Sequence, residues 1–336
     1  MQSTSQDSSE RFHAFVEQAS KGRNSLPRIL IGLCIILAVW FAGTFALMAG
    51  GAYALHFGWL PAQWAPRSSG NAFFAFAESR AGLVAAILTV GCIWPGVWLA
   101  VRLVHRRRLA TLFGAESRIA GGDFWRALLA TLIVAVLISL VTLLTEPKLT
   151  ATGISPVTWL IALPIALVVL LIQTSAEEVL FRGYLMQTLA QRFRSPWVWA
   201  VAPALLFALA HWFPDAQPWM NAAVIFSIFL FAMGAVLLVK ATGNLGAAMG
   251  MHFANNLVAF LFVTAGPPGQ ALAFFATPSV DDPSWTISDA AIGGLLQIVM
   301  MAAILALLLL KGSPLRLKSP QPAEYRTGVA AETPAR

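Results

Sequence analysis

Eight stretches of mostly apolar residues, each about as long as a membrane span, recur along this chain of 336 residues. A helix needs roughly 20 such residues to cross a hydrocarbon core about 30 Å thick. With 58% hydrophobic and 11% charged residues, the composition is not that of a soluble protein. The sequence therefore predicts an all-α fold, a polytopic membrane helix bundle of about eight transmembrane helices. The expected spans are 29–52, 82–104, 127–144, 157–180, 197–213, 219–239, 245–264 and 290–310.

The positive charges gather on one side of this predicted bundle. If both termini are cytoplasmic, 19 of the 22 lysines and arginines fall in cytoplasmic segments, and the outer loops keep only Arg67, Arg80 and Lys148. Cytoplasmic loops of membrane proteins carry such an excess. We therefore expect an integral membrane protein, in the plasma (inner) membrane, with both termini cytoplasmic. The net charge of +7 follows from this topology, so the expected partner is the lipid bilayer and not nucleic acid.

The chain divides into five expected segments without a separate soluble domain. Pro164 and Pro203 fall inside apolar helices, where each permits a kink, so we expect a kinked core. The outer loop from Gly266 to Asp289 is long enough to cap or gate the bundle, although a partly ordered connector is the simpler interpretation. The segments are 1–28, polar and cytoplasmic; 29–150, N-terminal transmembrane helices; 151–264, core helices; 265–312, the outer loop and last transmembrane helix; and 313–336, a disordered cytoplasmic tail.

Four ionisable residues lie within apolar sequence. They are the neighbours Glu177 and Glu178, and the histidines His211 and His252. An ionisable side chain at membrane depth costs roughly 2.5 kcal/mol or more, so it normally has partners and a function. Each histidine alone could equally be a packed core residue, which is why the four have to be interpreted together.

Helical geometry separates the roles of the two glutamates. Successive residues on a helix point about 100° apart, so Glu177 and Glu178 cannot face the same way. Glu178 and Arg182 are four residues apart with the acid first, the favourable order for an ion pair. This leaves Glu177 to face a cavity, as a candidate general base.

Two further pairs follow on later helices. Phe207 and His211 share one helical face, and so do His252 and Asn256, whereas Asn255 is expected to point elsewhere. A carboxylate, two imidazoles and an amide can together activate water and stabilise an oxyanion. This set suits amide hydrolysis, although the spacing alone leaves other chemistry open.

The three motifs in this order resemble the signature of the CPBP family, the CaaX-processing and bacteriocin-processing intramembrane endopeptidases, also called the Abi family. The motifs are Glu-Glu-x-x-x-Arg at 177–182, Phe-x-x-x-His at 207–211 and His-x-x-x-Asn at 252–256, and the likeness covers roughly 157–264. The resemblance implies a kinked catalytic core and an intramembrane protease acting on membrane-associated peptides or proteins, among them prenylated CaaX proteins and leader peptides.

The resemblance also implies a role for each motif residue. Glu177 and His211 would activate the water, and His252 and Asn256 would stabilise the oxyanion. Glu178 and Arg182 would form a structural pair, and we place Phe207 with them as a supporting residue.

We expect no cofactor and no metal site, and three alternatives remain. A zinc-dependent metalloendopeptidase would bind its ion through Glu177, His211 and His252, a plausible ligand set, but no His-Glu-x-x-His stretch is present. Intramembrane Glu, His and Arg also form proton relays in transporters, although no internal repeat is evident. The third alternative is a non-catalytic immunity or scaffold protein.

The predicted depths of the site residues conflict with one another. Glu177 falls near the inner end of its span, His211 near the outer end of the next, and His252 near the middle of a third. Groups that act on one bond must lie within a few ångströms of one another. We therefore expect the helix that carries Glu177 to be long and kinked and to continue to about Gln191.

Overall fold

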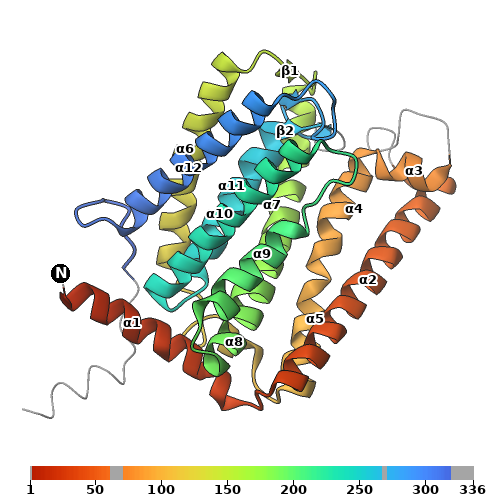
Figure 1. Ribbon diagram of the computed structural model, residues 1–336. Helices are drawn as coiled ribbons and strands as arrows, with labels where there is room; N and C mark the ends of the chain where they lie inside the picture. Colours follow the sequence, from red (N-terminus) through yellow and green to blue (C-terminus); the bar gives the residue numbers. More distant parts are fainter. Residues whose placement is uncertain (1, 61–70, 267–270, 319–336) are drawn as a thin grey trace, which may run out of the picture.

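The computed structural model describes residues 2–60, 71–266 and 271–318 as a bundle of helices with a small sheet at one end (Figure 1). The α-helices are α1 (Gln2–Glu17), α2 (Leu26–His56), α3 (Ala72–Ala77), α4 (Arg80–Gly91), α5 (Ile93–Leu99), α6 (Gly121–Thr145), α7 (Pro156–Glu178), α8 (Gln187–Arg192), α9 (Ala202–Leu209), α10 (Pro218–Thr242), α11 (Gly246–Leu261) and α12 (Ile287–Leu309). Short 3-10 turns form η1 (Gln18–Lys21) and η3 (Leu109–Leu112). Stretches of π-helix form η2 (Ala100–Val104), η4 (Val179–Met186) and η5 (Trp197–Val201).

Six helices of the described chain are long and apolar enough to cross a membrane, and they confirm the predicted polytopic bundle. They are Leu26–His56, Arg80–Val104, Gly121–Thr145, Pro156–Arg192, Pro218–Thr242 and Ile287–Leu309. The other two expected spans are shorter than predicted, because Trp197–Leu209 ends before His211 and α11 has only 16 residues. The six long helices, the shorter apolar helix Trp197–Leu209 and α11 correspond to the eight expected stretches.

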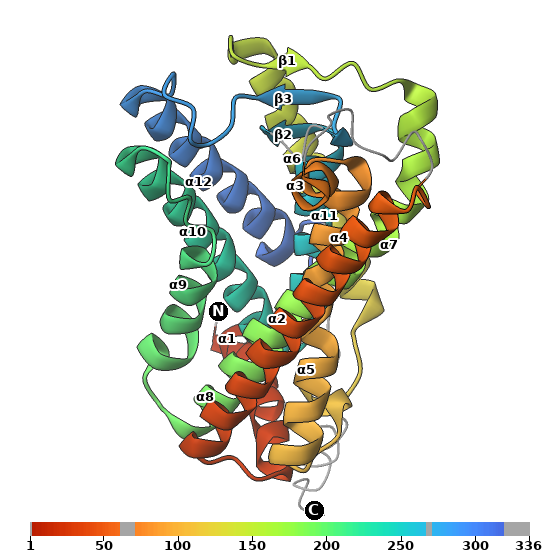
Figure 2. The same ribbon diagram turned by 90° about the vertical axis from the view of Figure 1, so that its right-hand side faces the viewer.

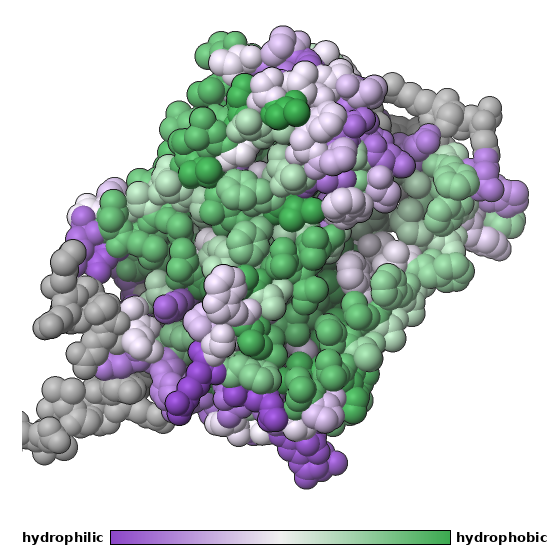
Figure 3. Space-filling model, in the orientation of Figure 1, coloured by the Kyte–Doolittle hydropathy of each residue, from purple (hydrophilic) through white to green (hydrophobic). Residues whose placement is uncertain are grey.

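The outer surface of the bundle is apolar where lipid would surround it. Figure 3 shows a broad hydrophobic band, with hydrophilic residues concentrated toward the two ends of the molecule. Large side chains in this band are left open, such as Phe45, which is 75% exposed, and Leu144, which is 86% exposed. In water, such exposed apolar side chains would lower the solubility of the protein. In a bilayer they contact lipid tails without a free-energy penalty. The fold is therefore that of an integral membrane protein.

Helix α11 runs through the centre of the bundle between α6, α7 and α10. Its small residues allow this close packing. A Cβ atom at Gly250 would overlap the backbone carbonyl of Phe124 on α6, so glycine is required at this crossing. Ala247 and Ala254 are fully buried. This burial places His252, on the same helix, inside the protein.

The helix that carries the two glutamates is long, as predicted. Helix α7 continues through η4 into α8, so that one helical segment of 37 residues extends from Pro156 to Arg192. Pro164 lies inside α7, and the π-helical stretch begins directly after Glu178. A π-helical turn changes the direction of the side chains that follow it and often occurs at functional sites.

Both ends of the bundle are more ordered than the sequence indicates. At one end, α1 packs against α10 and α8, and Phe15 is fully buried. At the other, β1 (Thr150–Ala151), β3 (Phe275–Thr277) and β2 (Val263–Ala265) form a sheet in that order, antiparallel between β1 and β3 and parallel between β2 and β3 (Figure 2). The outer loop is thus a partly ordered connector. Residues 267–270 of this loop and residues 319–336 of the expected tail lie outside the described residues.

Candidate active site

Glu178 and Arg182 form the predicted ion pair at the junction of α7 and η4. Arg182 Nη1 donates to Glu178 Oε1 at 3.0 Å, and both side chains are buried. The second guanidinium nitrogen, Nη2, donates to the carbonyl of Ala232 on α10 at 3.1 Å. The pair therefore connects the long helix formed by α7, η4 and α8 to α10, and it fixes the position of Glu178.

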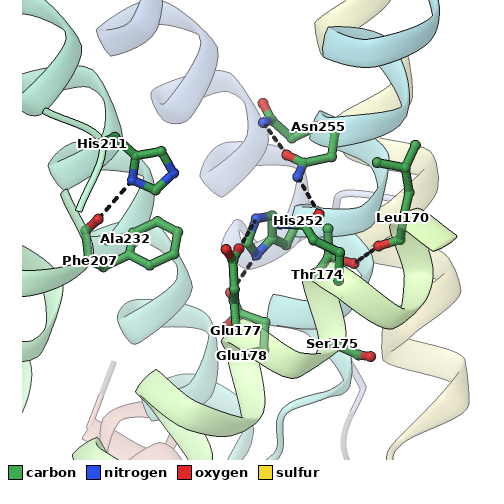
Figure 4. A network of polar contacts seen from close by, with 12 residues as sticks. Leu170, Thr174, Ser175, Glu177, Glu178, Phe207, His211, Ala232, His252 and Asn255 are labelled. Carbon is green, nitrogen blue, oxygen red and sulfur yellow. Dashed lines mark hydrogen bonds and ion pairs between the residues drawn. The ribbon is translucent and has the colours of Figure 1, made fainter. Parts of the chain in front are cut away.

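His252 lies between the two glutamates. Its Nδ1 is 2.8 Å from Glu178 Oε1, and its Nε2 is 3.3 Å from Glu177 Oε2 (Figure 4). Because Arg182 holds Glu178 as an acceptor, we infer that Nδ1 of the imidazole carries a hydrogen and donates it to Glu178. The Nε2 atom is thereby aimed at Glu177. The sequence predicted a role for His252 beside Asn256 but did not predict its contact with both carboxylates.

Glu177 differs from Glu178 in its surroundings, as the helical geometry indicated. Its side chain retains 13% exposure, whereas that of Glu178 is completely buried. Among the described residues, Oε2 of Glu177 has no hydrogen-bond partner, apart from the ion-pair contact with His252. Glu177 also lines the adjoining cavity, so its carboxylate group lies next to the space between the helices.

Asn256 lies one turn after His252 on α11, and its amide is held by a residue of α7. Asn256 Nδ2 donates to Gln173 Oε1 at 2.9 Å. Asn255 Nδ2 in turn donates to Asn256 Oδ1 at 3.2 Å, and Asn255 lines the same cavity. The expectation that Asn255 points elsewhere is wrong, because this part of α11 presents both amides to the space between the helices.

His211 is fixed by the end of helix α9. It lies just after α9, where its Nδ1 donates to the carbonyl of Phe207 at 2.9 Å and so satisfies one of the free carbonyls of the last turn. The two rings pack with centroids 5.1 Å apart, as their spacing predicted. Because Nδ1 donates, Nε2 of neutral His211 is an acceptor. Phe207 also packs against His252 and under the guanidinium of Arg182.

One cavity of about 280 Å³ joins these side chains. In Figure 4, His211 lies across the site from Glu177 and His252, just after the helix that carries Phe207. The cavity lining combines the predicted residues Glu177, Phe207, His211, His252 and Asn256 with Gln173, Ser227, Ile228, Phe231, Asn255, Phe260 and Gln297. The sequence had placed these residues at different depths in the membrane. The long α7 segment and the early end of α9 bring the three motifs together at this cavity.

The polar atoms of the site are connected by hydrogen bonds and ion-pair contacts. His252 has both nitrogens directed at carboxylates, and Nδ1 of His211 is bonded to a carbonyl. Within the described ranges, no three His, Cys, Asp or Glu side chains are placed to hold one metal ion.

Several lining residues were not predicted from the motifs. Gln173 precedes Glu177 by four residues and therefore lies on the same helical face, a signal that the sequence contains. Phe231, whose ring lies 5.1 Å from that of His252, and Gln297 come from α10 and α12. Both are ordinary residues in apolar helices, and no local pattern distinguishes them.

The bundle and its buried Glu–His cluster define a polytopic helical membrane protein with an ionisable site between its helices. Comparison with known proteins agrees with this description. Residues 158–258, which carry all three motifs, match the model of the family described as type II CAAX prenyl endopeptidase Rce1-like. The resemblance to the CPBP family is confirmed for this part of the chain.

A relative in Bacillus subtilis (strain 168), the uncharacterized protein YyaK, is 28% identical over 176 residues. The matched stretch covers 51% of this chain and 57% of that protein. The similarity therefore extends beyond the three motifs, and it spans little more than half of the relative.

Proposed function

We propose that this protein is an intramembrane endopeptidase that hydrolyses peptide bonds of membrane-associated peptides or proteins. Prenylated CaaX-type proteins and leader peptides are the candidate substrates, and the plasma membrane, with both termini cytoplasmic, is the proposed location. The match of residues 158–258 to the Rce1-like family supports a protease. The observation that carries the proposal is the Glu177 carboxylate in a cavity, next to an imidazole that Glu178 orients.

In the proposed reaction, Glu177 removes a proton from a water molecule as the water oxygen attacks the scissile carbonyl. His211, whose Nε2 is an acceptor, helps to orient or deprotonate this water. The carbon–oxygen double bond opens to an oxyanion, and then the carbon–nitrogen bond breaks. The carbonyl re-forms as this bond breaks, and the proton held by Glu177 passes to the leaving nitrogen, which gives a carboxylic acid and an amine. The acid then transfers its proton to the amine, so the products are a carboxylate and an ammonium group.

Asn256 and His252 are the proposed donors to the oxyanion. An amide group has two N–H donors, and one of those on Asn256 is used by Gln173. The other N–H remains to bind the developing negative charge. His252 contributes through Nε2, which is a donor when the ring is protonated between Glu177 and Glu178. Glu178 and Arg182 support the site from outside the cavity, and Phe207 supports it by packing against His211 and His252.

We propose that the reaction needs no metal ion or other cofactor. A zinc-dependent endopeptidase using the same residues is the alternative, and activity that survives exhaustive chelation would exclude it. A transport protein or a non-catalytic immunity protein is the other alternative.

The test compares the peptides released from membranes that contain the wild type, the Glu177→Gln variant or the Glu78→Gln variant. Glu177→Gln keeps the shape of the side chain and removes the base, so it should insert normally and release none of the specific peptides. Glu78 is exposed and remote from the site, which makes Glu78→Gln the matched control with full activity. Unchanged peptides from Glu177→Gln membranes would refute the proposal, and the peptides lost would identify the substrate.

A further inference from the structure

A second concave site lies at the end of the bundle that is rich in arginine. It is a pocket of about 450 Å³ between the beginning of α2 and the end of η2. Two candidate spans terminate here, one starting at Leu26 and the other ending at Val104. In Figures 1 and 2 this is the lower end of the molecule, where α2 and α5 lie side by side. The pocket therefore lies at the depth where a spanning helix reaches the headgroups of the bilayer.

Three arginines line this pocket, Arg23, Arg28 and Arg106. None of the three forms an ion pair with a carboxylate in the described ranges of the chain. Arg28 Nη1 donates to Ser25 Oγ at 3.1 Å, and Ser25 also lines the pocket. Three converging cations without an acidic partner favour an anionic ligand.

The backbone around Arg106 is constrained in an unusual conformation. Arg106 has φ of 54°, in the left-handed region that non-glycine residues seldom adopt. Its neighbours His105 and Arg107 are buried and hydrogen-bonded, which leaves only the Arg106 side chain exposed. The left-handed turn thus places Arg106 on the surface beside the pocket, while its neighbours hold the loop in the protein.

Arg23 is held in place by the same loop. Its backbone N–H donates to the His105 carbonyl at 2.8 Å, and Nδ1 of His105 donates to the Arg23 carbonyl at 2.9 Å. Nε2 of His105 lies 2.9 Å from the hydroxyl of Tyr184 on η4. The residues that present two of the three arginines are therefore tied to each other and to the long helix, so the pocket is preformed.

The rest of the pocket wall is apolar and open. Ile31 is 53% exposed and Leu103 is 63% exposed, and both line the pocket together with the arginines. A soluble anion would bind the guanidinium groups without using this wall. An anionic phospholipid would use both parts, with its phosphate on the arginines and an acyl chain against Ile31 and Leu103.

We propose that this pocket binds the headgroup of one anionic phospholipid from the surrounding leaflet. Membrane proteins commonly carry an excess of arginines on one side because of their topology, but these arginines need not line one pocket. Arg192 and Arg194, at the same end of the bundle, do not line this pocket. The proposal does not depend on the endopeptidase activity.

The experiment measures bound lipid on the full chain by native mass spectrometry, with phosphatidylglycerol and phosphatidylcholine offered at equal concentration in detergent. The wild type should retain phosphatidylglycerol preferentially. The triple variant Arg23→Gln, Arg28→Gln, Arg106→Gln should lower this preference at least about tenfold, because it removes the three cations that attract the anionic headgroup. A preference equal to that of the wild type would overturn the proposal.

The matched control removes three charges from the same end of the bundle but outside the pocket. Arg108, Arg192 and Arg194 are exposed and form no ion pair in the described part of the chain. Their triple replacement by Gln should keep the preference, and an equal loss in this control would show a diffuse charge effect and refute the pocket. Inorganic phosphate added as competitor separates the two sources of the anion. Displacement of the lipid by millimolar phosphate would indicate a site for soluble anions only.

A second measurement leaves all three arginines intact, in case the triple variant does not fold. A fluorophore is attached to Leu103→Cys in a Cys34→Ala, Cys92→Ala background, and the protein is reconstituted with brominated lipids. Brominated phosphatidylglycerol should quench this fluorophore more than brominated phosphatidylcholine at the same mole fraction. A label on Phe41→Cys, an exposed position on α2 outside the pocket, should show no such difference. Equal quenching by the two lipids at Leu103→Cys would overturn the proposal.

Discussion

Replacement of Arg182 by Met should destabilise the protein strongly, because it leaves Glu178 charged and buried. Methionine has a similar length but supplies no donor. The wild-type guanidinium donates to the Glu178 carboxylate at 3.0 Å and to the Ala232 carbonyl at 3.1 Å. The Glu178 side chain is completely buried, so water cannot replace the lost donors. Breaking a buried ion pair from one side costs about 3 to 5 kcal/mol, and we expect a loss in this range for Arg182→Met.

The free energy of unfolding can be measured by denaturant titration of the full chain in detergent micelles, with helicity as the signal. Arg192→Met is the matched control, because Arg192 is exposed at the end of α8, and it should change the free energy by less than about 0.5 kcal/mol. The double variant Glu178→Gln, Arg182→Met removes both charges, so it should be more stable than Arg182→Met alone. A loss below about 1 kcal/mol for Arg182→Met would refute the role assigned to this pair.

Two further predictions concern residues that the motifs did not include. Gln173→Ala removes the acceptor that holds the Asn256 amide, so kcat should fall about tenfold while KM changes little; an unchanged kcat would contradict the positioning role. Burial lowers the pKa of His105 from 6.5 to about 4, so the folded state favours the neutral ring. Its contribution to stability is complete above pH 6.5 and is lost as the pH falls from 6.5 toward 4, where the unfolded chain binds the proton more readily. Unfolding titrations across this window should show a steeper decline for the wild type than for His105→Gln, and identical slopes would contradict this assignment.

The membrane fold could be predicted from the sequence because its causes are local. The length of an apolar stretch determines whether it can cross the membrane as a helix. The six full spans coincide with six of the predicted stretches. The Glu178–Arg182 pair was predictable for the same reason, since it depends only on a spacing of four within one helix. The length of α11 was overestimated because a helix surrounded by other helices does not need to match the thickness of the bilayer.

The contacts between helices could not be predicted in this way. The position of His252 between both glutamates depends on the packing of α11 against α7, which no local pattern encodes. The contact of Gln173 with Asn256 joins residues 83 positions apart. The burial of Phe15 depends on packing of α1 against α8 and α10, although the N-terminal sequence is polar on average. In each case the residue could be identified in the sequence, but the residue that it contacts is determined by how the helices pack.

The central claim is that Glu177 activates the water that cleaves the peptide bond. The direct measurement is a single turnover of the purified full chain, in excess over a cleaved peptide, in water enriched in oxygen-18. The account predicts one labelled oxygen in the new carboxyl terminus of the product, no label in the enzyme segment that contains Glu177, and no product from the Glu177→Gln variant. Label in the Glu177 carboxyl group, or wild-type product formation by Glu177→Gln, would contradict it.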